Sequence, residues 1–297
     1  MFISVTSSVV PVNVELKSCV NTYLIAVGLG GEVYKNDAKE IHRLFTDPNI
    51  GAIEKQNAHL LLGRDATHKN IKGTLKGIAK LSKEHSIQSL VFYYSGHNRG
   101  GAYGSLRCHG GDQLREIELS KLLEDIKSER KLLILDCCFA VHMCPMKYDF
   151  KGGDEHATED ISDAEAQADE SISQDDEKYC MSIRQGSGFR MWAAGDRHEE
   201  AAGANEMNTN QKHSVFTKYI VAGLQGAKTC EFGNTCRHCE TYRRSLESEK
   251  CVLFTKIADF VYQHVDKELD SNQNPKTMGL CDLEYKLAYA ACNLESD

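Results

Sequence analysis

Two short segments of the chain carry residue types that suit nucleophilic catalysis. His97 follows the run 89–94 (SLVFYY), and Cys137 and Cys138 follow the run 131–136 (KLLILD). A cysteine thiolate is a strong nucleophile, and a nearby imidazole can accept the thiol proton. If the two runs are neighbouring strands of a parallel sheet, their carboxyl ends lie at one edge, where such sheets bind ligands. The pattern therefore predicts a Cys–His pair.

Strand periodicity favours one of the two cysteines. Side chains alternate between the faces of a strand, so Asp136 and Cys138 share one side and Cys137 faces the other. We therefore predict that Cys138 is the nucleophile and that Cys137 packs as a small apolar residue.

The order of expected strands and helices along the chain indicates how His97 and the two cysteines are positioned. Apolar runs typical of strands alternate with segments of helical periodicity, and a glycine-rich loop occupies 97–111. This order predicts a parallel sheet with helices on both faces. The expected strands are 22–29, 59–62, 89–94, 131–136 and 188–195, and the expected helices are 36–45, 70–85, 118–128, 214–224 and 252–265.

Length and composition exclude several classes of protein. The chain has 297 residues, of which 41% are hydrophobic and 26% charged, with only 4 prolines. These values exclude a disordered, collagenous or small disulfide-rich protein and fit a single α/β domain. No apolar run reaches the roughly 18 residues that span a bilayer, and the N-terminus lacks the pattern of a secretory signal. The sequence predicts a soluble, cytoplasmic protein.

The negative charge is concentrated in one segment. The formal net charge is −8, and residues 154–177 contain 11 acidic residues and no Lys or Arg. Outside this segment there is no basic stripe with interleaved aromatic residues, so we expect no nucleic-acid partner.

The segments 93–97 (YYSGH) and 133–138 (LILDCC) together resemble the caspase-fold cysteine peptidases, and most closely the metacaspase and paracaspase branch. Three further segments support the resemblance, which extends over about residues 20–292 apart from two inserts: 36–38 (NDA), 214–217 (SVFT) and 273–275 (QNP). The resemblance implies an α/β, caspase-like (caspase-hemoglobinase) three-layer fold, with a mostly parallel central sheet and helices on both faces.

The resemblance also implies roles for individual residues. His97 would be the general base, and Cys138 would form a thioester with the substrate, its backbone N–H contributing to the oxyanion hole. Asp37, Ser95 and Asp136 match positions that line the primary specificity pocket of this branch. Because two carboxylates suit a guanidinium or ammonium group, the implied substrates are proteins or peptides cut after Arg or Lys. Caspases that cut after Asp carry signatures such as Q-A-C-R-G instead.

The chain departs from the family pattern at three places. Asn98 follows the histidine where the family has glycine, and 139–141 read FAV where metacaspases read HSG. Residues 98–111 contain no acidic residue, so calcium dependence is not expected. These departures leave two alternatives open, a catalytically silent caspase-like signalling or scaffold domain and a thiol hydrolase that is not a protease.

The single peptidase domain (1–297) divides into a large segment (about 20–150), an acidic linker (151–178) and a small segment (179–297). The linker is expected to stay solvated and open to proteolysis. Because its acidic run contains no base, we predict activating cleavage, as in a zymogen, at a flanking base: Lys147, Lys151, Lys178 or Arg184. The alternatives are a passive loop or a docking surface for a basic partner. The oligomeric state is left open.

The small segment contains a cysteine-rich insert at 228–250. Cys236 and Cys239 form a C-x2-C pair, and Cys230, His238 and Cys251 lie nearby. These are ligand types of a tetrahedral zinc site, but the spacing fits no standard finger. Reduced thiols are the preferred interpretation of the chain's 12 cysteines, so the prediction includes no cofactor or metal. Zinc bound by Cys230, Cys236, Cys239 and Cys251 is the alternative.

Overall fold

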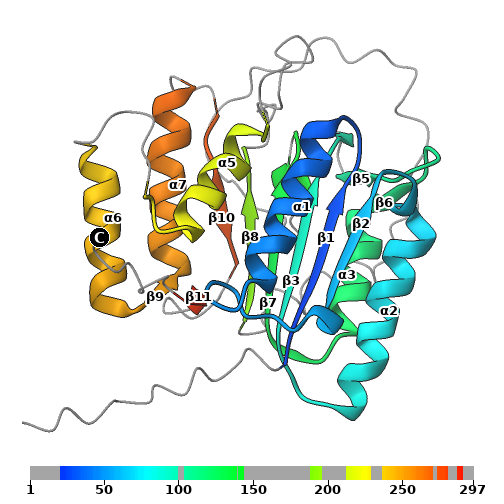
Figure 1. The fold of residues 1–297 in the computed structure, drawn as a ribbon. Coiled ribbons are helices and arrows are strands. Elements are labelled where there is room, and N and C mark those ends of the chain that lie inside the picture. The colour runs from blue at the N-terminus through cyan, green and yellow to red at the C-terminus, as the bar shows by residue number, and fades with distance from the viewer. Residues whose placement is uncertain are drawn as a thin grey trace, which may run out of the picture.

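A six-stranded sheet in the order β10-β8-β7-β3-β1-β2 forms the centre of the computed structural model (Figure 1). The structure describes residues 21–99, 104–138, 140–143, 188–195, 212–228, 236–269, 273–279 and 286–289. Adjacent strands pair in parallel, except for antiparallel β10 at one edge. The strands are β1 (Thr22–Gly28), β2 (Ala58–Leu62), β3 (Ile87–Ser95), β7 (Ser128–Asp136), β8 (Phe189–Ala193) and β10 (Lys276–Met278).

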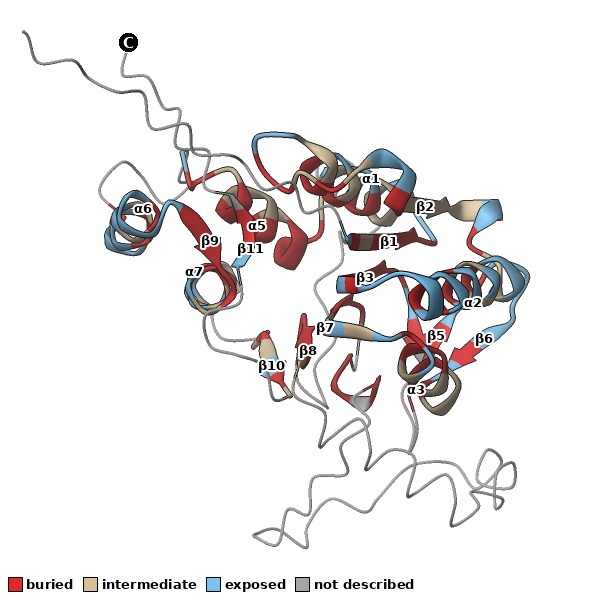
Figure 2. Ribbon diagram, turned by 90° about the horizontal axis from the view of Figure 1, so that it is seen from below, coloured by how far each residue is buried: buried red, intermediate tan, exposed pale blue. Residues whose placement is uncertain are grey.

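Helices cover both faces of this sheet (Figure 2). Alternate strand residues point to opposite faces: Leu24 and Ala26 of β1 pack with α1, α5 and α7, and Ile25 and Val27 pack with α2 and α3. The sheet is thus buried on both sides, which explains the continuous apolar runs of its central strands. The helices are α1 (Glu32–Thr46), α2 (His68–Glu84), α3 (Glu116–Glu124), α5 (Val215–Leu224), α6 (Arg237–Glu249) and α7 (Phe254–Glu268).

Two small antiparallel sheets and three short 3₁₀ turns complete the described part of the chain. One sheet joins β4 (Asn98–Arg99), β5 (Ser105–Arg107) and β6 (Gln113–Arg115), and the other joins β9 (Cys251–Leu253) and β11 (Lys286–Tyr289). The turns are Lys55–Asn57, Gly63–Asp65 and Ala140–Met143. None of the helices in the described ranges has the length and apolar character needed to cross a membrane.

The predicted three-layer α/β fold is confirmed, with corrections at element boundaries. The helix expected at 118–128 ends at Glu124, because the chain turns through buried Ile126 and enters β7 at Ser128. The helix expected from residue 252 begins at Phe254, since Val252 belongs to β9. The loop expected at 97–111 contains the short strands β4 and β5. Helix α6 and the strands β6, β9, β10 and β11 were not predicted.

Candidate active site

The predicted catalytic residues follow two strands that are hydrogen-bonded neighbours. In the parallel pairing of β3 and β7, Ser95 lies opposite Asp136. The Gly96 N–H extends this pairing by donating to the Asp136 carbonyl over 3.2 Å. His97 lies two residues after Ser95, and Cys138 lies two residues after Asp136. The two strands are thus neighbours, which is the condition for the predicted Cys–His pair, and both residues emerge at the carboxyl edge of the sheet, where parallel sheets bind ligands.

Gly96 is required by close packing just before His97. A Cβ atom at this position would lie 2.7 Å from the Tyr94 hydroxyl and 2.8 Å from the Leu29 carbonyl oxygen, and both distances are shorter than real Cβ contacts. The Leu29 N–H donates to the Ser95 carbonyl over 3.0 Å, which fixes the neighbouring chain. The S-G-H segment therefore has glycine where β1 and β3 leave no room for a side chain.

The backbone of His97 is held firmly while its side chain is exposed. The His97 carbonyl accepts hydrogen bonds from the Tyr94 hydroxyl (2.8 Å) and the Arg107 N–H (3.1 Å). On the side of α1, Tyr34 contacts the imidazole edge to face, with ring centroids 5.2 Å apart. Such a contact favours one ring orientation, so Tyr34 positions an imidazole that solvent can still reach. Sequence reasoning did not identify Tyr34.

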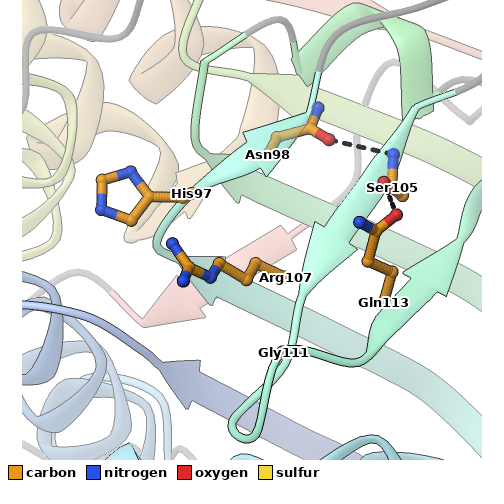
Figure 3. Close-up of a pocket in the computed structure, with 6 residues that line it drawn as sticks. All are labelled: His97, Asn98, Ser105, Arg107, Gly111 and Gln113. Atoms are coloured by element: carbon orange, nitrogen blue, oxygen red, sulfur yellow. Dashed lines mark hydrogen bonds between the residues drawn. The ribbon is translucent and has the colours of Figure 1, made fainter. Parts of the chain in front are cut away.

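A pocket of about 490 Å³ opens beside His97, formed largely by the small sheet β4-β5-β6 (Figure 3). Its lining residues are His97, Asn98, Ser105, Arg107, Gly111 and Gln113. Arg107 is exposed, and Figure 3 shows its guanidinium extending to the same side as the His97 ring. The pocket thus offers a cationic, polar surface next to the imidazole.

Asn98 belongs to the wall of this pocket. Its side-chain oxygen accepts a hydrogen bond from the Ser105 N–H over 3.0 Å, which ties β4 to β5. The non-glycine residues with positive φ in the described ranges are Ala52, Ala227 and Lys250, so Asn98 does not use the left-handed conformation that asparagine tolerates.

The two adjacent cysteines lie in different environments. Cys137 is 1% exposed and packs in the core on the side of α2 and α3. Burial and the neighbouring Asp136 carboxylate raise the pKa of Cys137 well above its ordinary value, which keeps it a neutral thiol. Cys138 is partly exposed. Cys137 packs as a small apolar residue, as predicted, and Cys138 is the cysteine that a substrate can reach.

Asp37, Ser95 and Asp136 come together beneath this edge, on the side of α1 and α5. Asp37 comes from α1, and the other two end β3 and β7. The Ser95 hydroxyl donates to Asp37 over 2.9 Å. All three are at most 2% exposed. Residues predicted to share a specificity pocket are therefore adjacent, although they do not line the pocket of Figure 3.

The start of α5 supplies the remaining hydrogen bonds to the two carboxylates. The hydroxyls of Ser214 and Thr217 donate to Asp136, the latter over 2.5 Å. The Ser214 N–H donates to Asp37 over 3.2 Å, and His213 Nδ1 lies 2.9 Å from the same carboxylate. Ser214 also caps α5 by accepting from the Thr217 N–H. The segment 214–217 thus serves both the helix and the carboxylates, a role that the sequence did not reveal.

Electrostatics within this cluster are unfavourable for two negative charges. Burial, followed by the charge of Asp37, raises the pKa of Asp136 to about 7, although the hydrogen bonds from Ser214 and Thr217 act in the opposite direction. A buried carboxylate with a carboxylate neighbour is stabilised by a cation. A positive charge close to the two carboxylates would therefore make ionisation of Asp136 less costly.

Several predicted residues lie outside the described residues. They are Phe139, Cys230, the acidic linker 151–178 and the flanking bases Lys147, Lys151, Lys178 and Arg184. Cys236, Cys239 and Cys251 are described and are buried in the small segment.

Comparison with known families agrees with this arrangement. The family model described as the caspase domain matches residues 32–275, a range that begins at α1 and ends just before β10. No curated protein matches the chain. The matched range covers most of the chain and includes the two strand ends that carry His97 and Cys138. The chain therefore belongs to the caspase domain family of cysteine peptidases.

Proposed function

We propose that the protein is a cysteine endopeptidase in which Cys138 and His97 form the catalytic dyad and which cuts after Arg or Lys. The observation that carries the proposal is the pairing of Ser95 with Asp136, since it brings an exposed histidine and a partly exposed cysteine out at equivalent positions of adjacent strands. Placement in the metacaspase and paracaspase branch is part of the same proposal and rests on the S-G-H and D-x-C segments.

The proposed reaction follows the chemistry of thiol proteases. His97 accepts the proton of Cys138, and the sulfur attacks the carbonyl carbon of the scissile bond. The resulting oxyanion is stabilised by hydrogen-bond donors, including the backbone N–H of Cys138. His97 then protonates the leaving amine, and a thioester remains. Water attacks the thioester with His97 as base, releasing the carboxylic acid and restoring the thiol.

The buried carboxylates support selectivity for basic residues. Burial and the charge of Asp37 raise the pKa of Asp136, and a guanidinium or ammonium near the two carboxylates would offset both effects, with charge-assisted hydrogen bonds fixing its position. A substrate carboxylate would instead add a third negative charge. Asp136→Ala should therefore lower kcat/KM for Arg and Lys substrates by a large factor.

The test uses fluorogenic peptides that differ only in having Arg, Lys or Asp before the cut bond. Wild-type protein is expected to cleave the Arg and Lys peptides, Cys138→Ala to lose this activity, and Cys137→Ala to retain most of it, because Cys137 is a buried core residue. Equal loss in two folded variants would contradict the choice of nucleophile. Preference for Asp would contradict the pocket, and no cleavage by wild-type protein would favour the silent scaffold domain.

A further inference from the structure

Three side chains that bind metals well meet between α6 and α7. Cys236, Cys239 and His264 are all buried, and their ligand atoms lie within 4.8 Å of one another. Figure 1 shows the two helices side by side, away from the β2 edge of the main sheet. None of these residues belongs to the proposed active site, and His264 was not identified from the sequence.

The sulfur–nitrogen distances are close to those of a tetrahedral zinc site, of which these residues would supply three of the four ligands. His264 Nε2 lies 3.6 Å from Cys236 Sγ and 3.2 Å from Cys239 Sγ. Zn–S bonds of about 2.3 Å and Zn–N bonds of about 2.0 Å place sulfur and nitrogen about 3.5 Å apart at tetrahedral angles. Both sulfur–nitrogen distances are therefore within a few tenths of an ångström of the value that a shared zinc ion requires.

The hydrogen bond on the other ring nitrogen selects the tautomer that a metal requires. His264 Nδ1 lies 2.8 Å from the Phe260 carbonyl oxygen. A carbonyl can only accept, so Nδ1 carries the proton and Nε2 directs its lone pair at the two sulfurs. Metal-binding histidines are commonly oriented by such a bond. A metal ion placed on this lone pair would bind the nitrogen and both sulfurs at once.

Local structure prepares the cysteines as ligands. Cys236 is the N-cap residue of α6 and Cys239 lies three residues later, a spacing that places both on one side of the first turn. The helix N-terminus favours thiolates. Two thiolates and a neutral imidazole offset the charge of a divalent ion, so the complex is neutral, as burial requires.

We propose that Cys236, Cys239 and His264 bind a Zn²⁺ ion that fastens the N-terminus of α6 to α7. Helix α6 buries only Cys239, Tyr242 and Leu246, so a metal would add substantially to its attachment. Binding would convert two thiols to thiolates and release their two protons to solvent. The ligand set differs from the zinc alternative drawn from the sequence, since Cys251 is not a member of the cluster and His264 is.

The test measures bound metal directly. Protein purified under reducing conditions and passed through metal-free buffer is expected to retain about one zinc ion per chain by plasma mass spectrometry. After replacement by Co²⁺, the spectrum should show thiolate-to-cobalt charge transfer and the d–d bands of tetrahedral cobalt. Cys239→Ser and His264→Gln should each lose the ion. Cys251→Ser, which changes a buried thiol of β9 outside the cluster, should retain it.

Three results would overturn the proposal. The first is wild-type protein that holds far less than one equivalent of zinc and shows no cobalt–thiolate band. The second is full metal retention by Cys239→Ser and His264→Gln. The third is a Cys236–Cys239 disulfide, found by peptide mapping of freshly prepared, non-reduced protein, which would indicate a redox pair. The cobalt spectrum of wild-type protein distinguishes a bound from an absent metal even if the variants fail to fold.

Discussion

The buried Asp136 carboxylate should destabilise the fold when it is ionised. Its pKa is raised from 3.8 to about 7 by burial and by Asp37. Because the folded state then binds the proton more tightly than the unfolded state, stability falls as pH rises between these two values. Asp136→Asn removes the charge and retains an oxygen that can accept the hydroxyl protons of Ser214 and Thr217. Relative to wild type, this variant should gain stability as pH rises.

The expected size follows from the pKa shift. One pKa unit corresponds to about 1.4 kcal/mol. Relative to acidic pH, where Asp136 is protonated in both states, the raised pKa therefore lowers the stability of wild type by about 4 kcal/mol at pH 8 and by less than half of that at pH 5. The buried amide that Asp136→Asn introduces has its own cost, about 1–3 kcal/mol if its N–H groups lack acceptors, but this cost is independent of pH. The free energy of unfolding of Asp136→Asn, relative to wild type, should therefore rise by about 3 kcal/mol between pH 5 and pH 8.

Urea denaturation of both proteins at pH 5 and pH 8 gives this difference. Asp259→Asn, an exposed substitution on α7, serves as control and should show little change between the two pH values. Constant relative stability of Asp136→Asn would refute the inference that ionisation of this buried carboxyl is costly. If the carboxylate also binds the substrate cation, the same variant should gain stability at pH 8 while its kcat/KM for Arg peptides falls.

Two further predictions concern the histidine and the acidic linker. Tyr34→Ala removes the ring that orients His97. Because such a contact contributes about 1 kcal/mol, kcat should fall about fivefold with little change in KM. The control Tyr262→Ala, at an exposed tyrosine, should have no effect, and an unchanged kcat in Tyr34→Ala would contradict the positioning role. Incubated wild-type protein should be cut after one of the bases that flank the acidic run 154–177. Intact mass measurement of wild type and Cys138→Ala in parallel would show the cut, and uncut wild type that is fully active would contradict activation by cleavage.

The sequence was most informative where local pattern alone determines structure. The central strands β3 and β7 are buried on both faces, so their apolar runs were recognisable, and the residues that follow them could be assigned to one sheet edge. The first residues of β7, from Ser128, are less buried, and the start of this strand was predicted as helix. Helix α6 was missed because its sequence is largely polar and its buried side is narrow.

Two contacts between segments distant in sequence were not predicted. Asp136 is bound by Ser214 and Thr217, which lie 78 and 81 residues further along the chain. The segment containing them was recognised as the start of a helix and as a family match, but not as a partner of Asp136. His264 lies on the buried face of α7, and its meeting with Cys239 depends on how two helices pack. A histidine on an otherwise apolar helix face was the available signal.

Covalent labelling tests most directly whether Cys138 is the nucleophile of a peptidase selective for basic residues. The protein is treated with peptide chloromethylketones that end in Arg or in Asp, and the modified residue is identified by mass spectrometry after digestion. The Arg probe is expected to modify Cys138 in wild-type protein, the Asp probe to leave it unmodified, and Cys138→Ala to remain unlabelled. Modification of Cys137 instead, equal labelling by both probes, or no labelling at all would contradict the assignment.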